Sequence, residues 1–455
     1  MADPGILRTN RDFRRFWIGS AVSTLGSQMS LIAFPLLVLS LGGGAAQAGL
    51  VASCSLVTRM LFRLPGGQLA DRMDRRKLMV GANLVRLTTV ASIPVAAGLG
   101  HLAYPQLLIV AVVEGTATAV FAPASTTAVR DVVPDDQLSD ALAKDQSSMA
   151  AASLVGPFLG GWLFTVDRIL PFTVDAASYA VSIVLLLRMV SRPPQAAEGT
   201  ARDNRVTAGV RWLLGQPSLL RLLLFAALLN LVGSAAEVAM VVTLRSSGTG
   251  GTSIGLVMAC AGVGALLGSL AAPRVMKTFT PGQLFLTIGV TWAGGLAVFA
   301  CTQQPWVLGP LLVLLILLTP PAGIVVGQAM LSRSPRELLG RVSTAVDLLV
   351  AGLAALGPIL TGLALQGIGI SPTWLLLAAL VGAATLVAVV PMLRDGGFAA
   401  GPEPKQAAEP ASEQAAGSAS DAAPTREAGT TSEAGTTSEA GPTSAGRPPV
   451  EPAAV

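Results

Sequence analysis

Among the ionisable side chains inside long apolar stretches of this sequence, where a charge is costly, four are candidates for function. Two are carboxyl groups, Glu114 and Glu237, and two are guanidinium groups, Arg59 and Arg86. A charged side chain at the centre of a bilayer costs about 2.5–3.5 kcal/mol on insertion scales, so such residues are functional candidates. A carboxyl group in this setting can carry a proton or bind a cation, and we expect one or both glutamates to do so. The alternative is an ion pair of Glu114 with Arg59 or Arg86 that serves only the fold.

The composition indicates that lipid surrounds much of the chain. Of its 455 residues, 52% are hydrophobic and 12% are charged, whereas soluble domains carry about 25% charged residues. Apolar runs of about 20 residues, the length that crosses a bilayer, recur along the sequence. The predicted spans are 16–41, 47–69, 78–99, 105–127, 145–166, 170–189, 219–243, 253–273, 282–301, 306–330, 342–365 and 373–393. The first run is too long for a cleavable signal peptide, so it is predicted to be a retained span.

The positive charges predict the orientation of these spans. Of 30 Lys and Arg residues, Arg168 and Arg245 fall in loops on the side away from the amino terminus, and Arg59, Arg63 and Arg86 fall well inside spans. All the others lie on the side of the amino terminus. Because cytoplasmic loops are enriched in Lys and Arg, both termini are predicted to be cytoplasmic. The expected location is the inner (plasma) membrane, with multiple spans.

A repeat divides the spans into two sets of six. The residues Pro134, Leu138, Gly156, Pro157, Leu159 and Gly161 recur 201 positions later as Pro335, Leu339, Gly357, Pro358, Leu360 and Gly362. Such repeats place a substrate site between the halves near the membrane midplane. We therefore expect six-helix bundles at 1–189 and 219–393, and a linker at 190–218 with a short amphipathic helix. The tail, 394–455, is rich in small and polar residues and is expected to be disordered.

The loop after the second predicted span carries a recognisable pattern. It reads Gly67-Gln68-Leu69-Ala70-Asp71-Arg72-Met73-Asp74-Arg75-Arg76-Lys77. This resembles the signature loop of the major facilitator superfamily, except that Asp74 stands where the family has glycine. Gly67 is expected to allow close helix packing, and the cations to hold the turn at the anionic leaflet. The resemblance implies that Asp71, with Arg72, Arg75 and Arg76, forms a latch against Gly340 and Arg341 in the outward-facing state.

A second pattern, Gly156-Pro157-Phe158-Leu159-Gly160-Gly161, lies in the fifth predicted span. It resembles the motif associated with exporters of this superfamily, with Ser147 in place of an earlier glycine. The glycines would permit close packing, and Pro157 would kink the helix. Together with the stretches 10–17, 121–124 and 175–178, it resembles the bacterial exporter branch that includes macrolide efflux proteins and the enterobactin exporter. The alternative for the motif is a packing kink without directional meaning.

The resemblance implies an all-α membrane protein of twelve transmembrane helices in two pseudo-symmetric bundles. Spans one, four, seven and ten would line a central cavity, which places Glu114 and Glu237 on opposite halves. The implied function is secondary active export of small hydrophobic molecules such as drugs or antibiotics, by proton antiport with alternating access. Two alternatives stay open: export of an endogenous metabolite such as a siderophore or a self-made antibiotic, and import.

Several other functions find no support in the sequence. The chain has no phosphate-binding Gly-x-x-x-x-Gly-Lys-Ser/Thr loop of an ATP-driven pump. It has one histidine and three scattered cysteines, so we expect no metal, no cofactor and no enzymatic activity, and nothing points to nucleic acid. The expected partners are a small-molecule substrate, protons and the lipid bilayer, and the protein is expected to be a monomer. Asp175 and Asp347 are expected to lie near the membrane surface as capping or packing residues, and no aromatic substrate cage is apparent.

Overall fold

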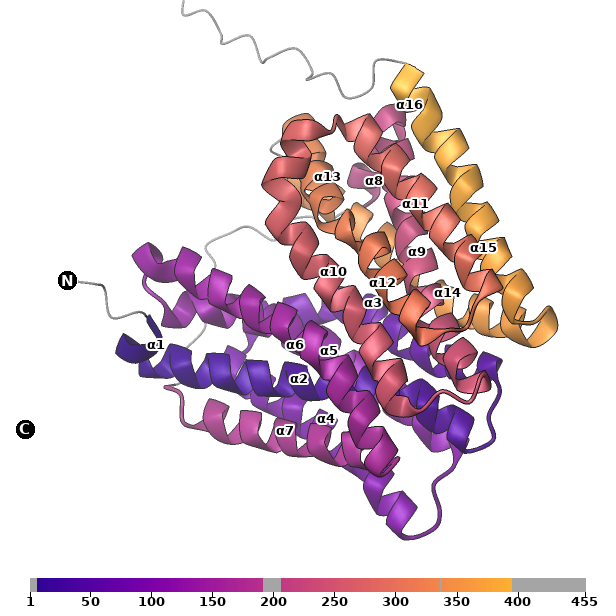
Figure 1. The fold of residues 1–455 in the computed structure, drawn as a ribbon. Helices are drawn as coiled ribbons and strands as arrows, with labels where there is room; N and C mark the ends of the chain where they lie inside the picture. The colour runs from indigo at the N-terminus through magenta and orange to yellow at the C-terminus, as the bar shows by residue number, and fades with distance from the viewer. Residues whose placement is uncertain (1–5, 191–205, 336–337, 395–455) are drawn as a thin grey trace, which may run out of the picture. The chain divides into compact units, whose positions relative to one another are not determined.

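The computed structural model describes residues 6–190, 206–335 and 338–394, and the elements in these ranges are helical. The predicted tail beyond residue 394 and most of the linker, 191–205, lie outside the described residues. The helices (Figure 1) are α1 (Ile6–Thr9), α2 (Arg11–Ser40), α3 (Ala45–Arg72), α4 (Arg75–Gly98), α5 (Tyr104–Val132), η1 (Asp135–Gln137), α6 (Leu138–Val166), α7 (Leu170–Leu187), α8 (Val206–Leu214), α9 (Pro217–Ser246), α10 (Gly251–Thr278), α11 (Pro281–Cys301), α12 (Pro305–Leu317), α13 (Thr319–Arg333), α14 (Leu339–Gly367), α15 (Ile370–Ala384), η2 (Thr385–Val389) and α16 (Val390–Arg394).

Twelve helical segments are long and apolar enough to cross a membrane, which confirms the predicted fold class and number of spans. Two of them depart from a simple α-helix. The tenth, Pro305–Arg333, consists of α12 and α13, because Pro320 and Pro321 follow Leu318 and cannot continue the backbone hydrogen bonding of a helix. The twelfth, Ile370–Val389, ends in the π-helical turn η2.

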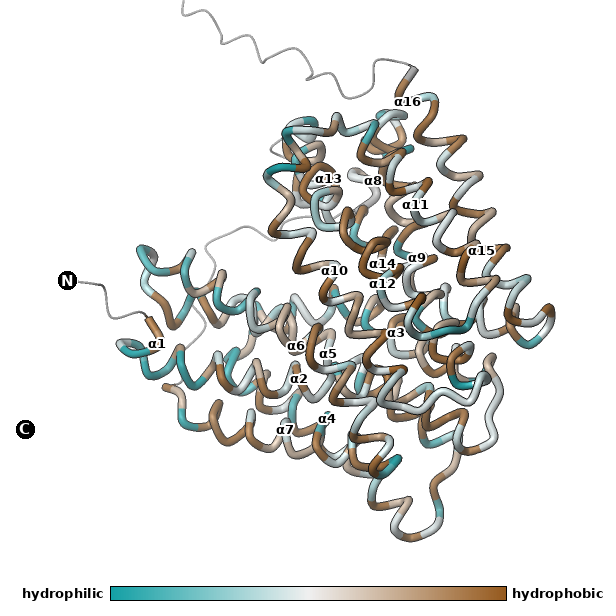
Figure 2. Tube along the Cα trace, viewed as in Figure 1, coloured by the Kyte–Doolittle hydropathy of each residue, from teal (hydrophilic) through white to brown (hydrophobic). Residues whose placement is uncertain are grey.

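The helix ends form two sets, which we name here for reference. The basic end holds the start of α2 and the turns α3–α4 and α5–α6, which are rich in Lys and Arg, and the opposite end holds the turns α2–α3 and α9–α10. Figure 2 shows hydrophilic residues gathered at helix ends and hydrophobic residues along the helices. At the opposite end, Gly42 and Gly248 turn the chain with positive φ angles of 82° and 80°, a conformation that glycine adopts without strain.

Polar caps fix two helix starts at the basic end. The Asn10 side chain accepts a hydrogen bond from the Phe13 N–H at 2.9 Å, and its amide donates to the Val132 carbonyl at 2.7 Å. The first bond caps α2, and the second ties its start to the end of α5. Asp74 caps α4 by accepting from the Lys77 N–H at 3.2 Å. The aspartate that replaces the family's glycine therefore has a local structural role.

The packing of the second six spans repeats that of the first. In the first half (α2–α7), α2 packs on α6, α3 on α5, and α4 on α7. In the second half (α9–η2), α9 packs on α14, α10 on α12, and α11 on α15. Between the halves, α3 packs on α14 and α6 packs on α10. When each helix is replaced by its counterpart in the other half, one of these contacts becomes the other. The arrangement agrees with the 201-residue repeat in the sequence.

Candidate functional site

A cavity of about 430 Å³ lies between the two halves. Its wall includes residues of α2, α3, α5, α6 and α7 from the first half and of α9, α10, α11, α12 and α14 from the second. The lining is therefore wider than spans one, four, seven and ten, because residues of neighbouring helices also reach the cavity. Both glutamates singled out in the sequence, Glu114 and Glu237, belong to the wall.

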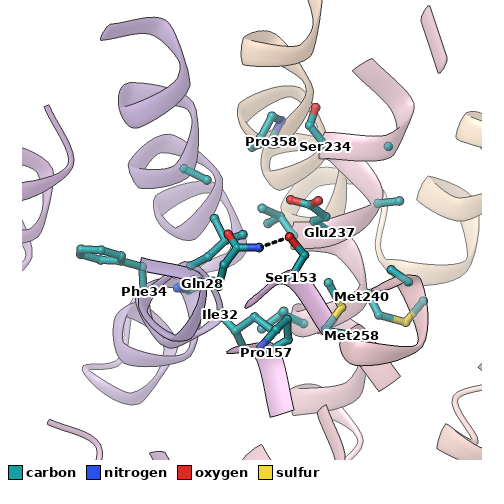
Figure 3. A pocket seen from close by; sticks show the side chains of 18 of the residues that line it. Gln28, Ile32, Phe34, Ser153, Pro157, Ser234, Glu237, Met240, Met258 and Pro358 are labelled. Atoms are coloured by element: carbon teal, nitrogen blue, oxygen red, sulfur yellow. Dashed lines mark hydrogen bonds between the residues drawn. The ribbon is translucent and has the colours of Figure 1, made fainter. Parts of the chain in front are cut away.

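Glu237 of α9 points into the cavity without a charged partner. Figure 3 shows its carboxyl group facing Gln28 and Ser153, whose side chains are joined by a 2.9 Å hydrogen bond from the Gln28 amide. The thioethers of Met240 and Met258 lie on the same side of the cavity (Figure 3). Among the described residues, no Lys or Arg lies within ion-pair distance of Glu237. Its carboxyl group is therefore available to a proton or to a cation in the cavity.

Glu114 of α5, in contrast, is surrounded by donors of its own half. Its Oε2 accepts from Arg59 Nη2 at 3.5 Å and from the Ser55 hydroxyl at 3.3 Å. Its Oε1 accepts from the Thr118 hydroxyl at 2.8 Å and lies 4.0 Å from Arg86 Nη2. Both ion pairs that the sequence left open are present. Because opposite charges and hydrogen bonds favour the ionised carboxylate, this arrangement is suited to an internal counter-ion.

Arg86 of α4 is the more deeply buried of the two arginines, with 5% of its surface exposed. Its guanidinium group lies 5.0 Å from the ring centre of Phe121 and 5.4 Å from that of Tyr179. It also donates to the Thr118 hydroxyl and, at 3.5 Å, to Asn83 Oδ1. Cation–π contacts stabilise a desolvated guanidinium group, so Arg86 is held in the wall, whereas Arg59 is 39% exposed and lines the cavity.

Asp175 of α7 corrects an expectation from the sequence. It was predicted near the membrane surface, but it is 1% exposed and belongs to the cavity wall. Its Oδ2 accepts a 2.6 Å hydrogen bond from the Ser30 hydroxyl of α2. The expected contact of Asp175 with surface water is therefore wrong, because depth along one helix does not reveal which neighbours cover a side chain; the contact with α2 agrees with the expected packing role. Asp347 is half exposed, and it pairs with Arg63 at 3.2 Å.

Several apolar lining residues were missed in the sequence. Trp292 and Phe299 of α11 and Phe34 of α2 contribute rings to the wall, although no aromatic substrate cage was predicted. The Trp292 indole N–H donates to the Leu315 carbonyl at 2.8 Å, which fixes the ring between α11 and α12. No sequence signal distinguishes these rings from lipid-facing ones, because every span is apolar on most of its surface.

The glycines of the predicted exporter motif lie at close helix contacts. A Cβ at Gly160 would lie 2.9 Å from Met29 Cα of α2, and one at Gly161 would lie 2.9 Å from Gly255 Cα of α10. Gly156 faces Gln28, and Pro157 contributes its carbonyl to the contact with Gly255. The motif therefore serves both the packing within the first half and the contact between the halves.

The contacts between the halves extend towards the opposite end. The Thr165 and Thr252 hydroxyls lie 3.1 Å apart where α6 and α10 meet. On the other side of the cavity, the Ile359 N–H of α14 donates to the Ser53 hydroxyl of α3 at 2.9 Å. Figure 1 shows α6 and α10 diverging from their contact towards the basic end. The halves are thus held together by direct hydrogen bonds at the opposite end.

The predicted latch residues occupy the basic end. Arg75 pairs with Asp131 at the end of α5, and Arg76 donates to the Leu186 carbonyl of α7 at 2.9 Å. These two cations bind protein groups instead of the anionic leaflet, because the α3–α4 turn lies over the ends of α5 and α7. Arg72 is exposed.

Asp71 and Gly67 take part in fewer contacts than expected. Asp71 is exposed, and no hydrogen bond or ion pair joins it to another described residue, Gly340 and Arg341 included. A Cβ at Gly67 would meet no atom within 4 Å, whereas one at the preceding Gly66 would lie 3.1 Å from Val120 Cα. In this conformation the close approach of α3 to α5 thus depends on Gly66 and not on Gly67.

Metal chemistry finds no support in the described part of the chain. No group of three or more His, Cys, Asp or Glu residues gathers there with a geometry that could hold an ion. The ionisable groups of the cavity pair with one another or face an apolar space. The arrangement can bind a small molecule and move a proton, and a comparison with known proteins tests this interpretation.

The sequence profile of the Major Facilitator Superfamily matches residues 16–349. The chain belongs to this superfamily. It is therefore a transport protein of the membrane and not an enzyme, as predicted. The two six-helix halves and the cavity between them are the features through which such transporters bind their substrates.

Two groups of bacterial relatives match most of the chain. The multidrug efflux pump Tap of Mycobacterium tuberculosis is 28% identical over 391 residues, which cover 82% of this chain and 92% of Tap. The enterobactin exporter EntS of Citrobacter koseri is 24% identical over 414 residues, which cover 86% of this chain and 97% of EntS. These relatives confirm the resemblance to the exporter branch of the superfamily.

A solved structure confirms the fold independently. A bacterial homologue of the human lysosomal transporter Spinster, in an inward-facing and unoccupied conformation, superimposes with a TM-score of 0.67. The sequence identity is 14%, and the match covers 84% of this chain and 97% of that one. At this identity the likeness concerns the fold alone.

Proposed function

We propose that this protein exports small, largely apolar molecules across the inner membrane in exchange for protons, by alternating access. The observation that carries the proposal is Glu237, a carboxyl group without an ion-pair partner among the described residues, in a mostly apolar cavity between the two halves. The names of the relatives Tap and EntS, both exporters, support the direction of transport.

The cavity favours molecules with an apolar body and a positive charge. Met240, Met258 and Trp292 supply polarisable and aromatic surface beside Glu237, and methionine adapts to ligands of different shapes. A carboxylate in an apolar cavity is costly unless it is paired or protonated. Glu237 can therefore hold either a cationic substrate or a proton, and this competition is what an antiporter requires.

Orientation gives the exchange its direction. We propose that both termini and the basic end face the cytoplasm, because Lys and Arg gather there. The conformation with α6 and α10 in contact at the opposite end would then be open to the cytoplasm and ready to load substrate. Asp71 would engage α14 when the basic end closes, so its exposure here is compatible with the proposed latch.

Everted membrane vesicles that contain this protein test the proposal. Ethidium serves as the probe because it is flat, apolar and cationic. Addition of ethidium to vesicles with an acidic interior should release protons, which a pH-sensitive dye reports. The variant Glu237→Gln keeps the shape but cannot exchange a proton, so ethidium-dependent proton release should fall by at least about tenfold.

A matched carboxylate outside the cavity serves as the control. Asp140 is exposed on α6, where it pairs with Lys144 one turn away, and Asp140→Asn should leave proton release unchanged. Equal proton release per ethidium in the wild type and in Glu237→Gln would show that this carboxyl group does not couple transport.

A further inference from the structure

Asp175 is a buried carboxyl group of the cavity wall that the proposed function does not yet use. Its surroundings differ from those of Glu114, although the two belong to the same half. Among the described residues, Asp175 forms no ion pair, and its one short contact is the 2.6 Å hydrogen bond from Ser30. The Ser178 hydroxyl lies 3.5 Å from Oδ1 but donates mainly to the Asp175 carbonyl, at 2.7 Å.

The charged groups around Asp175 come from α4 and α5. Arg86 of α4 and Glu114 of α5 act on its carboxyl group through space, and the titratable neighbour on its own helix is Tyr179. From α2, which packs on α7 most closely, the facing groups are Ser30 and Gly26, which are uncharged. In the described part of the chain, no charged group of α6 acts on the Asp175 carboxyl group.

The two arginines are already engaged by Glu114. Arg59 Nη2 and Arg86 Nη2 lie 3.5 Å and 4.0 Å from its carboxylate oxygens, and Arg86 is also held over the Tyr179 and Phe121 rings. Asp175 is thus buried in the cavity wall, and no positively charged side chain in the described structure forms an ion pair with it. A buried carboxylate in this position is costly, whereas the protonated acid is not.

The hydrogen bond to Ser30 suits both protonation states. A serine hydroxyl can donate to a carboxylate, and after rotation its oxygen can accept from a carboxylic acid. Gly26 makes this contact possible, because a Cβ there would lie 2.5 Å from Asp175 Oδ1. The α2–α7 contact therefore places a group that can hold a proton at the edge of the cavity, with a partner that allows the proton to bind and leave.

We propose that Asp175 is a second proton-carrying residue of the transport cycle, and that Glu114 stays ionised as the counter-ion of Arg59 and Arg86. A proton from water entering the cavity would bind a carboxylate oxygen of Asp175 and would leave to water after the cavity opens to the other side. The proposal rests on the proposed proton antiport. It adds a carrier in the first half to Glu237 in the second.

The charge balance explains how this proton could oppose substrate. With Glu114 ionised and both arginines charged, the group carries one positive charge when Asp175 is protonated and none when it is ionised. Protonation of Asp175 therefore makes the first half of the cavity less favourable for a cation. Proton and cationic substrate would displace each other, and both halves of the cavity would take part.

Infrared spectroscopy of the purified protein tests the assignment without any substrate. A protonated carboxyl group gives a carbonyl-stretch band that an ionised one lacks. In the variant Glu237→Gln, which removes the other candidate, we expect such a band to remain near neutral pH, where the exposed Asp and Glu side chains are ionised, and to disappear as the pH is raised further. Adding Asp175→Asn should abolish it, and adding Glu114→Gln should leave it.

A third variant covers the possibility that Asp175→Asn does not fold. Ser30→Ala keeps the carboxyl group and removes its hydrogen-bond partner, so it should move the pH at which the band disappears by about one unit. A band that survives Asp175→Asn, or one that does not respond to Ser30→Ala, would overturn the proposal. So would the absence of the band from Glu237→Gln at every pH.

Transport in proteoliposomes separates this proposal from the proposed function. For Asp175→Asn, accumulation of ethidium driven by a pH gradient should fall by at least about tenfold. Undiminished pH-driven accumulation in Asp175→Asn would reject Asp175 as a carrier. If the wild type itself shows no pH-driven accumulation, the proposed antiport fails, and the infrared bands still decide whether Asp175 holds a proton.

Discussion

Two glutamates of the same cavity illustrate how neighbours, not residue type, determine a role. Glu114 accepts hydrogen bonds from Arg59, Ser55 and Thr118, while Glu237 faces the uncharged side chains of Gln28 and Ser153. The sequence identified both as buried acids, because a carboxyl group in an apolar run stands out. It could not reveal which of them is paired, since pairing depends on the rotation of each helix about its own axis.

The buried ion pair should make a large contribution to stability when only one partner is removed. Glu114→Gln leaves the guanidinium group of Arg86 buried without its counter-charge, so the free energy of unfolding should fall by about 3–5 kcal/mol. Arg86→Gln should have a similar effect, and the double variant should lose less than the sum, with a coupling of about 1–3 kcal/mol. Unfolding by denaturant in detergent micelles measures all three values.

An exposed ion pair on neighbouring helices provides a control for this double-mutant cycle. Arg63 and Asp347 lie 3.2 Å apart, and their side chains are 57% and 49% exposed. Their coupling should stay below about 1 kcal/mol because water screens both charges. Equal coupling in the two cycles would contradict the assignment of Glu114 as a buried counter-ion.

At the scale of helices, Pro358 shapes the contacts of α14 with both halves. Pro358 has no N–H, so the Ala354 carbonyl loses its helical partner, and the Ser234 hydroxyl of α9 donates to that carbonyl at 2.6 Å instead. The next residue, Ile359, donates its N–H to Ser53 of the other half. The kink thus converts a gap in the hydrogen bonding of α14 into contacts with two neighbouring helices.

The sequence predicted these elements well and their interruptions poorly. The lengths of the apolar runs were enough to find twelve spans, because a bilayer sets a minimum length. The break at Leu318 was missed, although Pro320 and Pro321 mark it, because an apolar run does not reveal whether its helix is continuous. Asp175 was misplaced for a related reason: its depth was judged from α7 alone, and α2 covers it.

Gly161 tests the contact between α6 and α10. A methyl group there would lie 2.9 Å from Gly255 Cα, so Gly161→Ala should separate the helices at the opposite end. Cysteines introduced at Thr165 and Thr252, in a chain whose three native cysteines are replaced, report the separation. Their cross-linking by a short reagent should slow at least severalfold in Gly161→Ala.

A glycine on α11 with open space provides the control for this measurement. A Cβ at Gly294 would meet no atom within 4 Å, so Gly294→Ala should leave the cross-linking rate as it is in the parent. If Gly161→Ala also cross-links at the parent rate, then close packing at Gly161 does not hold the opposite end together.

For the whole molecule, the duplication gives the cavity two walls with the same backbone arrangement but different side chains. The helix pairs of the first half recur in the second, and the contacts α3–α14 and α6–α10 exchange with each other under the same operation. Such symmetry allows one conformation to interconvert with its counterpart by rocking of the halves. The side chains have diverged, however, so that one wall carries the group of Glu114, Arg59, Arg86 and Asp175 and the other carries Glu237.

Transport by the purified protein shows whether a proton gradient drives substrate through this cavity. Liposomes that contain the protein, an acidic interior and no ATP are mixed with ethidium. Our account predicts that ethidium concentrates inside against its gradient, and that an ionophore that exchanges protons for potassium abolishes this accumulation. Accumulation that persists at the same level after the pH gradient is collapsed would contradict the account.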